Sequence, residues 1–358
     1  MGATASQSPA NATNGNAGNA GNAGNAGSET NGDEPGDSSA AVLTVAESTE
    51  ILLQQAGARA RDYARAAHAA NTRRAYRADW AAFTAWCQAR RRDALPAAPE
   101  TVALYLADRA DHCKTSTLQR RLVAIAQAHK AAELESPTTH ASVRAVWSGI
   151  RRIHGTAQTG KQAAVTADVR AMVATLTDTL PGWRDRALLL LGFAGAFRRG
   201  ELVALDVADV VSTRDGLVVT VRRGKTDQEG QGRQVGIPYG SRLPTCPVRA
   251  IEHWRVAAGI TSGPLFRPIN RHEQVRSTRL TDQSVALIVK RAAEAAGLDA
   301  ARYAGHSLRA GLATAAAAAG VSERAIMAQT GHKSVPMVRR YIRDGSLFNE
   351  NAAADVGL

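Results

Sequence analysis

Hydrophobic patterning constrains this chain more than any other sequence feature, because apolar residues recur at helical spacing over most of its length. Apolar residues make up 44% of the chain, dominated by Ala, Leu and Val, and aromatic residues only 4%. This composition favours helices over sheets and suffices for a sizeable core. Short β-branched runs separated by turn residues occur only at 207–211, 217–222 and 233–237. The sequence therefore predicts a mainly α (α+β) fold with one small antiparallel β-sheet.

Changes in composition divide the chain into five segments. Residues 1–45 are rich in Gly, Asn, Ala and Ser, so we expect a disordered low-complexity tail. Residues 46–153 are helical in pattern throughout and predict a compact helical bundle, whose helices begin at the caps Asn71 or Thr72 and Thr115 or Ser116. The polar segment 154–162 predicts a linker. Residues 163–345 form a second, mostly helical domain with the sheet, and 346–358 a C-terminal tail that is a candidate for contact between protomers.

The charge of the chain points to a nucleic acid as partner. The formal net charge is +12, and residues 1–45 contain four acidic and no basic side chains. The remainder therefore carries 44 basic and 28 acidic side chains, a net charge of +16. Such a balance indicates nucleic acid first and an anionic membrane surface second. In the bundle, the pairs Arg73–Arg74 and Arg120–Arg121 near helix starts suit DNA phosphates, although paired arginines on a solvated face are the alternative.

Cysteine usage and hydropathy exclude several classes of protein. The three cysteines, Cys87, Cys113 and Cys246, have no CxxC or Cys/His spacing, which argues against a disulfide framework and a zinc site. The longest apolar run is about eleven residues, too short to span a bilayer, and no secretory signal opens the chain. We therefore expect a cytoplasmic, nucleoid-associated protein with no membrane partner, metal or cofactor.

The C-terminal part of the second domain carries the densest group of reactive side chains. His306 and Arg309 are three residues apart and share a helical face. His332 follows a glycine, and arginines flank Tyr341, which argues against a core position for this tyrosine. Each residue is ambiguous alone, because both histidines could be core residues and Tyr341 could cap the domain edge. Tyr303 is a second candidate nucleophile, which we interpret as a packing residue.

Two upstream segments supply further cations. Arg198 lies at the predicted start of a helix, where Glu201 one turn later could hold its guanidinium group. A surface ion pair of little energetic value is the alternative. Lys225 lies in the turn after the second predicted strand, where a lysine more often protects a sheet edge. Neither of these two segments predicts a function on its own.

These elements occur in an order and spacing that resemble the tyrosine recombinase (phage integrase) family of site-specific recombinases. The elements are Arg198 with Glu201, Lys225, His306-x-x-Arg309, Gly331-His332 and Tyr341. The segments NTRRAYRADWAAFTAWC and TSTLQRRLVAI resemble that family's N-terminal core-binding (SAM-like) DNA-binding domain. The resemblance covers residues 46–345. Ala310 stands where many members have a second histidine, and His332 where some have tryptophan.

The resemblance implies an enzyme that cleaves and rejoins duplex DNA through a 3′-phosphotyrosyl intermediate, without metal or ATP. Cleavage without a metal requires cations that absorb charge on the phosphate oxygens. The resemblance assigns one role to each residue: nucleophile Tyr341, phosphate stabilisers Arg198 and Arg309, general base His306, general acid Lys225, and phosphate donor or transition-state stabiliser His332.

The resemblance also implies the partners of such an integrase. These are duplex DNA with specific recombination sites and three further copies of the chain in a DNA-bound homotetramer, while the free protein could be a monomer. Two alternatives use the same sequence features. One is a type IB topoisomerase-like enzyme that nicks and closes a single duplex, and the other is a non-catalytic DNA-binding protein.

Overall fold

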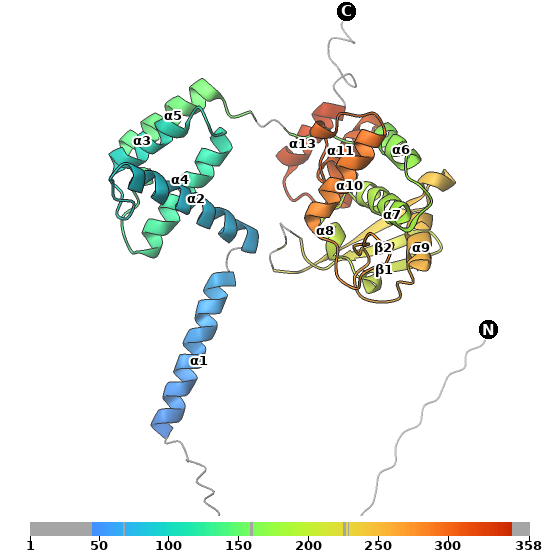
Figure 1. Cartoon of the computed structure of the whole chain (residues 1–358), viewed down its shortest axis with the longest axis horizontal. Helices are drawn as coiled ribbons and strands as arrows, with labels where there is room; N and C mark the ends of the chain where they lie inside the picture. Colours follow the sequence, from blue (N-terminus) through green and yellow to red (C-terminus); the bar gives the residue numbers. More distant parts are fainter. Residues whose placement is uncertain (1–44, 67–68, 158–159, 225–226, 228, 346–358) are drawn as a thin grey trace, which may run out of the picture. The chain divides into compact units, whose positions relative to one another are not determined.

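The computed structural model describes residues 45–66, 69–157, 160–224, 227 and 229–345 (Figure 1). It divides into two compact units, of which the first ends at Thr156 and the second begins at Ala157. Three sequence-based expectations concern residues outside the described ranges: the disordered tail at the N-terminus, the role of Lys225, and the contact between protomers through residues 346–358.

The first unit is helical, as its periodicity predicts. Its helices are α1 (Val45–Ala66), α2 (Ala70–Ala89), α3 (Pro99–Arg109), α4 (Thr115–Ala131) and α5 (Ala141–His154). Helices α2–α5 enclose a core that includes Phe83, Tyr105 and Ile125, each 0% exposed. The rings of Phe83 and Tyr105 meet edge to face with their centroids 5.0 Å apart. The residues of α1 whose burial is described are exposed, apart from the half-buried Gly57, so the bundle core comes from the other four helices.

Two helix starts were predicted wrongly by one to three residues. Asn71 and Thr72 lie within the first turn of α2, and the residue before this helix makes no side-chain cap bond. Thr115 is the first residue of α4 rather than its cap, which is Lys114. Packing of the buried helix faces sets these starts, because a side-chain cap contributes only about 1 kcal/mol.

A buried histidine ties the bundle together. His129 on α4 is 0% exposed. Its Nε2 accepts a hydrogen bond from the N–H of Ala97 at 2.9 Å, and its Nδ1 lies 2.9 Å from the carbonyl oxygen of Ile125. Because the carbonyl can only accept and the amide can only donate, the ring is neutral with its proton on Nδ1. His129 thereby fixes the loop before α3 to the last turns of α4.

The second unit contains eight α-helices among the described residues and the sheet. The helices are α6 (Thr166–Ala174), α7 (Leu180–Ala194), α8 (Arg199–Ala204), α9 (Pro247–Ala257), α10 (Asp282–Ala295), α11 (Ser307–Ala318), α12 (Glu323–Thr330) and α13 (Val335–Gly345). The strands β1 (Val210–Thr213), β2 (Gly216–Val221) and β3 (Arg233–Pro238) form an antiparallel sheet in the order β1-β2-β3.

The first strand begins later than the predicted 207–211. Residues Val207–Asp209 form a 3₁₀ turn instead. The carboxylate of Asp209 accepts a hydrogen bond from the backbone N–H of Asp206 at 2.8 Å, which closes this turn before the strand can start. The other two predicted strands agree with β2 and β3 to within one residue.

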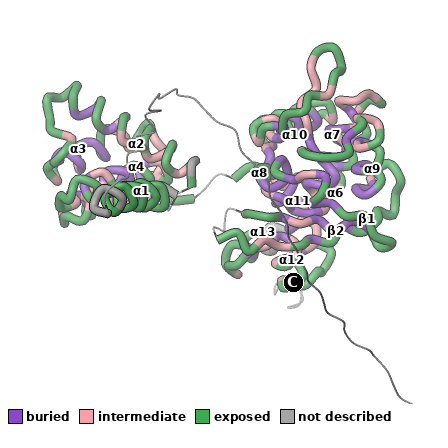
Figure 2. Tube along the Cα trace, turned by 90° about the horizontal axis from the view of Figure 1, so that it is seen from below, coloured by how far each residue is buried: buried purple, intermediate pink, exposed green. Residues whose placement is uncertain are grey.

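Helix α7 is the centre of the second unit. Its four consecutive leucines, 188–191, are all buried, as expected of a helix that is enclosed on every side. Helices α9 and α11 both pack against it, and Figure 2 shows buried residues concentrated in α6, α7, α10 and α11. The mostly helical architecture with one small antiparallel sheet confirms the predicted fold class. None of the helices in the described ranges is long and apolar enough to cross a membrane.

Replacing His129 with phenylalanine should destabilise the first unit. The ring would still fill the core, but the buried N–H of Ala97 would lose its acceptor, which costs about 1–3 kcal/mol. We expect a loss of this size in the free energy of unfolding, measured by urea titration of His129→Phe. Lys130→Ala, at the exposed neighbouring position, should change it by less than about 0.5 kcal/mol. Equal stability of His129→Phe and the wild type would contradict the assigned contact.

Candidate active site

The structure brings together the five predicted catalytic residues that it describes. Arg198 immediately precedes α8, and His306 and Arg309 lie at the start of α11. His332 lies between α12 and α13, and Tyr341 lies within α13. Hydrogen bonds join His306 to Tyr341 and Arg309 to His332, and the charge of Arg198 acts on Arg309. The cluster is therefore assembled from segments that are far apart in the sequence.

A left-handed turn at the end of α7 delivers Arg198 to the cluster. Ala196 has a φ of 49°, and the N–H of Phe197 bonds to the carbonyl of Gly192 at 3.2 Å, the pattern of a Schellman ending. The chain restarts at once as α8, where Glu201 accepts from both the backbone N–H and the guanidinium of Arg198. The Glu201 side chain is only 3% exposed. The carboxylate of this pair is therefore buried and the Arg198 side chain is 19% exposed, so the pair is not the weak surface ion pair considered above.

Arg309 is fully buried and is held by backbone carbonyls. Its Nη1 donates to the carbonyl oxygens of Ala196, at 2.8 Å, and Thr330, and its Nη2 lies 2.9 Å from Nε2 of His332. Its Nε is buried without a hydrogen-bond partner among the described residues. Burial, and then the neighbouring charge of Arg198, lower the pKa of Arg309 to about 10. The guanidinium therefore stays charged at neutral pH, with its Nε–H donor unused.

The hydrogen bonds around His332 fix its tautomer. Arg309 can only donate, so Nε2 of His332 accepts from it. Nδ1 lies 2.7 Å from the hydroxyl of Thr330, whose own proton goes to the carbonyl of Ile326 at 2.7 Å. Nδ1 therefore carries the proton. Burial, followed by the charge of Arg309, lowers the pKa of His332 to about 4, so the ring is neutral.

Tyr341 presents its hydroxyl to His306. The hydroxyl oxygen lies 2.8 Å from Nε2 of His306, and the ring of His332 lies on another side with the centroids 5.9 Å apart. Tyr341 is half-buried and packs against the small cluster that joins α11, α12 and α13. Tyr303, the other candidate nucleophile, is 2% exposed and donates to Asp168. Its interpretation as a packing residue agrees with this burial.

The hairpin that carries Lys225 reaches the cluster. Lys225 itself lies outside the described residues. The preceding Gly224 lies against the buried ion pair, because a Cβ at this position would be 3.1 Å from Oε1 of Glu201. Asp227 accepts hydrogen bonds from the backbone N–H groups of Gln231 and Gly232, which shapes the return of the loop. Gly224 therefore lies at the site, whereas Asp227 is held by hydrogen bonds within the loop.

One cation of the cluster was missed in the sequence. Arg233, the first residue of β3, donates to Oε2 of Glu201 at 3.4 Å and to the carbonyl of Gln329 at 3.1 Å. Its side chain is 22% exposed. The only sequence signal is a basic residue at the start of the strand after the loop, and this does not distinguish it from Arg222 and Arg223.

The arginines predicted to contact DNA in the first unit differ in their surroundings. Arg73 and Arg74 are exposed on α2. Arg120 on α4 forms two hydrogen bonds, at 2.6 and 3.1 Å, with the buried carboxylate of Asp79. Arg121 lies 3.8 Å from the same carboxylate and over the ring of Tyr105, with its side chain 17% exposed. Arg120 and Arg121 therefore also hold α4 to the bundle.

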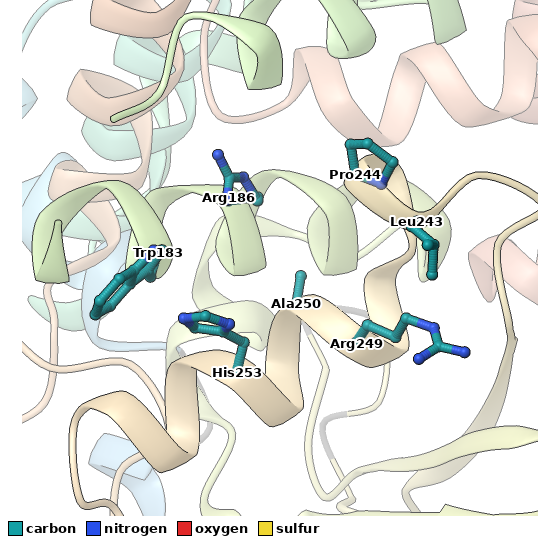
Figure 3. Close-up of a pocket in the computed structure, with 7 residues that line it drawn as sticks. All are labelled: Trp183, Arg186, Leu243, Pro244, Arg249, Ala250 and His253. Carbon is teal, nitrogen blue, oxygen red and sulfur yellow. The ribbon is translucent and has the colours of Figure 1, made fainter. Parts of the chain in front are cut away.

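A surface pocket lies between α7 and α9, apart from the cluster (Figure 3). Trp183 and His253 form one end of it, with their ring centroids 4.7 Å apart, and Arg186 and Arg249 add positive charge. None of the predicted catalytic residues lines it. Within the described ranges, no group of three or more His, Cys, Asp or Glu side chains is placed to hold a metal ion.

Comparisons with known proteins agree with the motif spacing. The family model described as the phage integrase family matches residues 165–346. The integrase/recombinase xerD homolog of Selenomonas ruminantium is 46% identical over 287 residues, which cover 79% of this chain and 84% of that protein. Recombinase cre of Escherichia phage P1 is 26% identical over 283 residues, 73% of this chain and 80% of that protein.

Solved structures share the fold. A lambda integrase dimer bound to a COC′ core site matches with a TM-score of 0.52 at 18% identity, covering 71% of this chain and 66% of that chain, just under two thirds of its length. The XerH recombinase in a post-cleavage complex matches with a TM-score of 0.51 at 15% identity, covering 72% of this chain and 70% of that one.

The fold and these matches define a tyrosine-type site-specific DNA recombinase. The chain belongs to the phage integrase family, because the family model spans half of its length and a relative at 46% identity covers most of it. The resemblance drawn from the motifs is therefore confirmed at the level of family and enzyme class.

The neutral His332 should make stability depend on pH. Its pKa is about 4 in the folded protein and ordinarily about 6.5 in an unfolded chain, so the unfolded state takes up the proton first as the pH falls. This contribution is complete above about pH 6.5 and is lost toward pH 4. We expect urea titrations to show that the wild type loses up to about 3 kcal/mol more than His332→Phe over this window. An equal loss of unfolding free energy in the two proteins over this pH window would contradict a neutral His332 ring.

Proposed function

We propose that this chain cleaves and rejoins duplex DNA at specific recombination sites through a 3′-phosphotyrosyl intermediate on Tyr341. The observation that carries the proposal is the 2.8 Å contact between the Tyr341 hydroxyl and Nε2 of His306. The buried Arg309, with Arg198 near it, belongs to the same cluster. The net charge of +16 beyond residue 45 supports DNA as the partner. So do the fold neighbours, which are a lambda integrase on a core site and XerH with its difH substrate.

In the cleavage step, the phenolic oxygen of Tyr341 attacks the scissile phosphorus. A new phosphorus–oxygen bond to Tyr341 forms as the bond to the 5′ oxygen of the next nucleotide breaks. Nε2 of His306 accepts the proton of the phenol. Lys225 supplies a proton to the departing 5′ oxygen. Attack of a 5′ hydroxyl on the phosphotyrosine reverses each transfer and reseals the strand, so neither metal nor ATP is required.

Arg198 and Arg309 stabilise the negative charge on the two non-bridging oxygens. Guanidinium groups are cationic at neutral pH, and Arg309, whose pKa is lowered to about 10, has an Nε–H for which the described residues provide no acceptor. Fixed donors in a partly dehydrated site are worth more than donors in water because they need no reorganisation as charge develops. His332 stabilises the same charge after its Nε2 gains a proton.

Two further parts of the proposal concern assembly on DNA. The exposed Arg73 and Arg74 on α2 contact phosphates, as do Arg120, with donors beyond those bonded to Asp79, and Arg121, which lies 3.8 Å from the same carboxylate. Exchange of strands between two duplexes requires four copies of the nucleophile, so we propose a homotetramer on DNA. The segment 346–358 is proposed to contact the neighbouring protomer.

Tyr341→Phe should abolish covalent attachment to DNA while leaving binding intact. The substitution removes only the attacking oxygen, so a nicked suicide substrate should give a denaturant-stable adduct with the wild type and none with the variant. Gel-shift affinities of the two proteins should agree within about threefold, since a single hydroxyl contributes little to phosphate contacts. Failure of the wild type to form an adduct on any candidate site would favour the DNA-binding alternative. Relaxation of one supercoiled duplex without recombined products would favour the topoisomerase alternative.

Replacing Arg73 and Arg74 together with alanine should weaken DNA binding in a salt-dependent way. Each phosphate contact contributes about 0.9 to the slope of log affinity against log salt, so the slope should fall by about 1.8. Circular dichroism should show unchanged stability, because both side chains are exposed. Arg120→Ala should in contrast also lower stability, since it removes the hydrogen-bonded partner of the buried Asp79. An unchanged salt slope in the double variant would exclude contacts from α2.

A further inference from the structure

Arg233 joins three parts of the candidate site that are distant in the sequence. It opens β3 and pairs with Val221 at the base of the hairpin that holds Lys225. Its Nη2 donates to Glu201 at the start of α8, and its Nη1 donates to the carbonyl of Gln329 at the end of α12. No other described residue bonds to both of these elements through one guanidinium group.

The contacts of Arg233 connect it to Arg198 and to His332, which are proposed to act on the phosphate. Its partner Glu201 also holds the guanidinium and the backbone N–H of Arg198. The Gln329 carbonyl begins the turn that leads to His332, and Gly331 in this turn lies against the Arg233 side chain. A Cβ at Gly331, whose φ is 67°, would be 2.8 Å from Nε of Arg233. The turn can therefore approach this arginine only because residue 331 is a glycine.

The charge of Arg233 also matters at the site. It acts on both Arg309 and His332, whose pKa values it lowers after the larger effects of burial and nearer charges. Burial lowers the pKa of Arg233 itself, and Glu201 opposes this shift. Three arginines beside one carboxylate give the cluster a net charge of +2. A phosphodiester carries a charge of −1, and the pentacoordinate transition state carries −2, so the cluster matches the transition state better than the ground state.

We propose that Arg233 is a positioning residue for the cleavage step, which holds Arg198 through Glu201 and the His332 turn through the Gln329 carbonyl. It contacts neither the phosphate nor the nucleophile. It acts by fixing the cations that do, and by adding to their field. The inference rests on the proposed phosphotyrosyl chemistry and deepens it. Arg233 therefore matters for the charge that develops on the non-bridging oxygens, and not for proton delivery to the leaving group.

Chemically altered substrates separate these two roles. Three suicide substrates differ only at the scissile position: an ordinary phosphodiester, a methylphosphonate in which an uncharged methyl group replaces one non-bridging oxygen, and a phosphorothiolate in which sulfur replaces the bridging 5′ oxygen. The methylphosphonate needs less cationic stabilisation. The phosphorothiolate needs no proton on its leaving group, because a thiolate leaves readily.

The experiment measures single-turnover adduct formation by full-length Arg233→Ala on each substrate. We expect a loss of about 10- to 100-fold against the wild type on the phosphodiester, within the range for a group that supports an oxyanion donor. DNA affinity should change by less than about threefold. The ratio of the wild-type rate to the Arg233→Ala rate should fall at least about fivefold on the methylphosphonate. On the phosphorothiolate this ratio should stay the same as on the phosphodiester.

Two control variants make the result specific. Arg233→Lys keeps the charge but cannot bridge two acceptors with a planar fork, so it should recover only part of the rate. Arg214→Ala removes an exposed arginine from the β1–β2 turn of the same sheet, where its side chain is 92% exposed, and should cleave at the wild-type rate. If Arg233→Ala unfolds, Arg233→Lys on the three substrates provides the same comparison.

Several outcomes would overturn the proposal. Recovery of Arg233→Ala on the phosphorothiolate alone would show that Arg233 acts through Lys225. An equal loss on all three substrates, with a lowered melting temperature, would show a merely structural role. Cleavage by Arg233→Ala at the wild-type rate would show that Arg233 has no role in this step. Each of these requires a wild type that forms the adduct. Absence of the wild-type adduct would instead reject the proposed function itself.

Discussion

The whole cluster depends on the buried carboxylate of Glu201. It accepts hydrogen bonds from the backbone and guanidinium of Arg198 and from Arg233, and its charge raises the pKa of Arg309 against the effect of burial. Without this carboxylate, three guanidinium groups would share a largely dehydrated site and repel one another. With it, they remain together and still leave an excess of positive charge for an anion. A single acid therefore makes a dense group of cations compatible with a folded protein.

Backbone carbonyls also hold the cluster in place, because they accept hydrogen bonds from Arg309. Arg309 donates to carbonyls at the end of α7 and the end of α12, so two helix ends fix the plane of its guanidinium before DNA binds. One of these carbonyls belongs to Ala196, a non-glycine residue in the left-handed region. This conformation is disfavoured for a residue with a side chain, and it occurs where the turn must both end α7 and aim a carbonyl at Arg309. Local strain and preorganisation of the site thus fall on the same residue.

Short-range geometry explains two of the residue pairs that the sequence predicted for the site, whereas His332 and Tyr341 were joined to them only through the family resemblance. His306 with Arg309, and Arg198 with Glu201, lie three residues apart, so helical spacing alone places each pair on one face. The mainly helical fold followed from periodicity for a similar reason. Arg233 was not predictable in this way, because its bond to Gln329 spans 96 residues. The pairing of Arg120 with Asp79 spans 41 residues, and only the packing of α2 on α4 creates it.

The hydrogen bonds of His332 connect substrate binding to chemistry. In the free site its Nε2 accepts from Arg309, so the ring orients that arginine and has no proton to donate toward a phosphate. The low pKa arises from burial and from the surrounding arginines. A bound phosphate brings negative charge to the same arginines, which opposes their effect on the ring and raises its affinity for a proton. In the proposed mechanism, the arginines that hold the phosphate therefore also set when His332 becomes a donor.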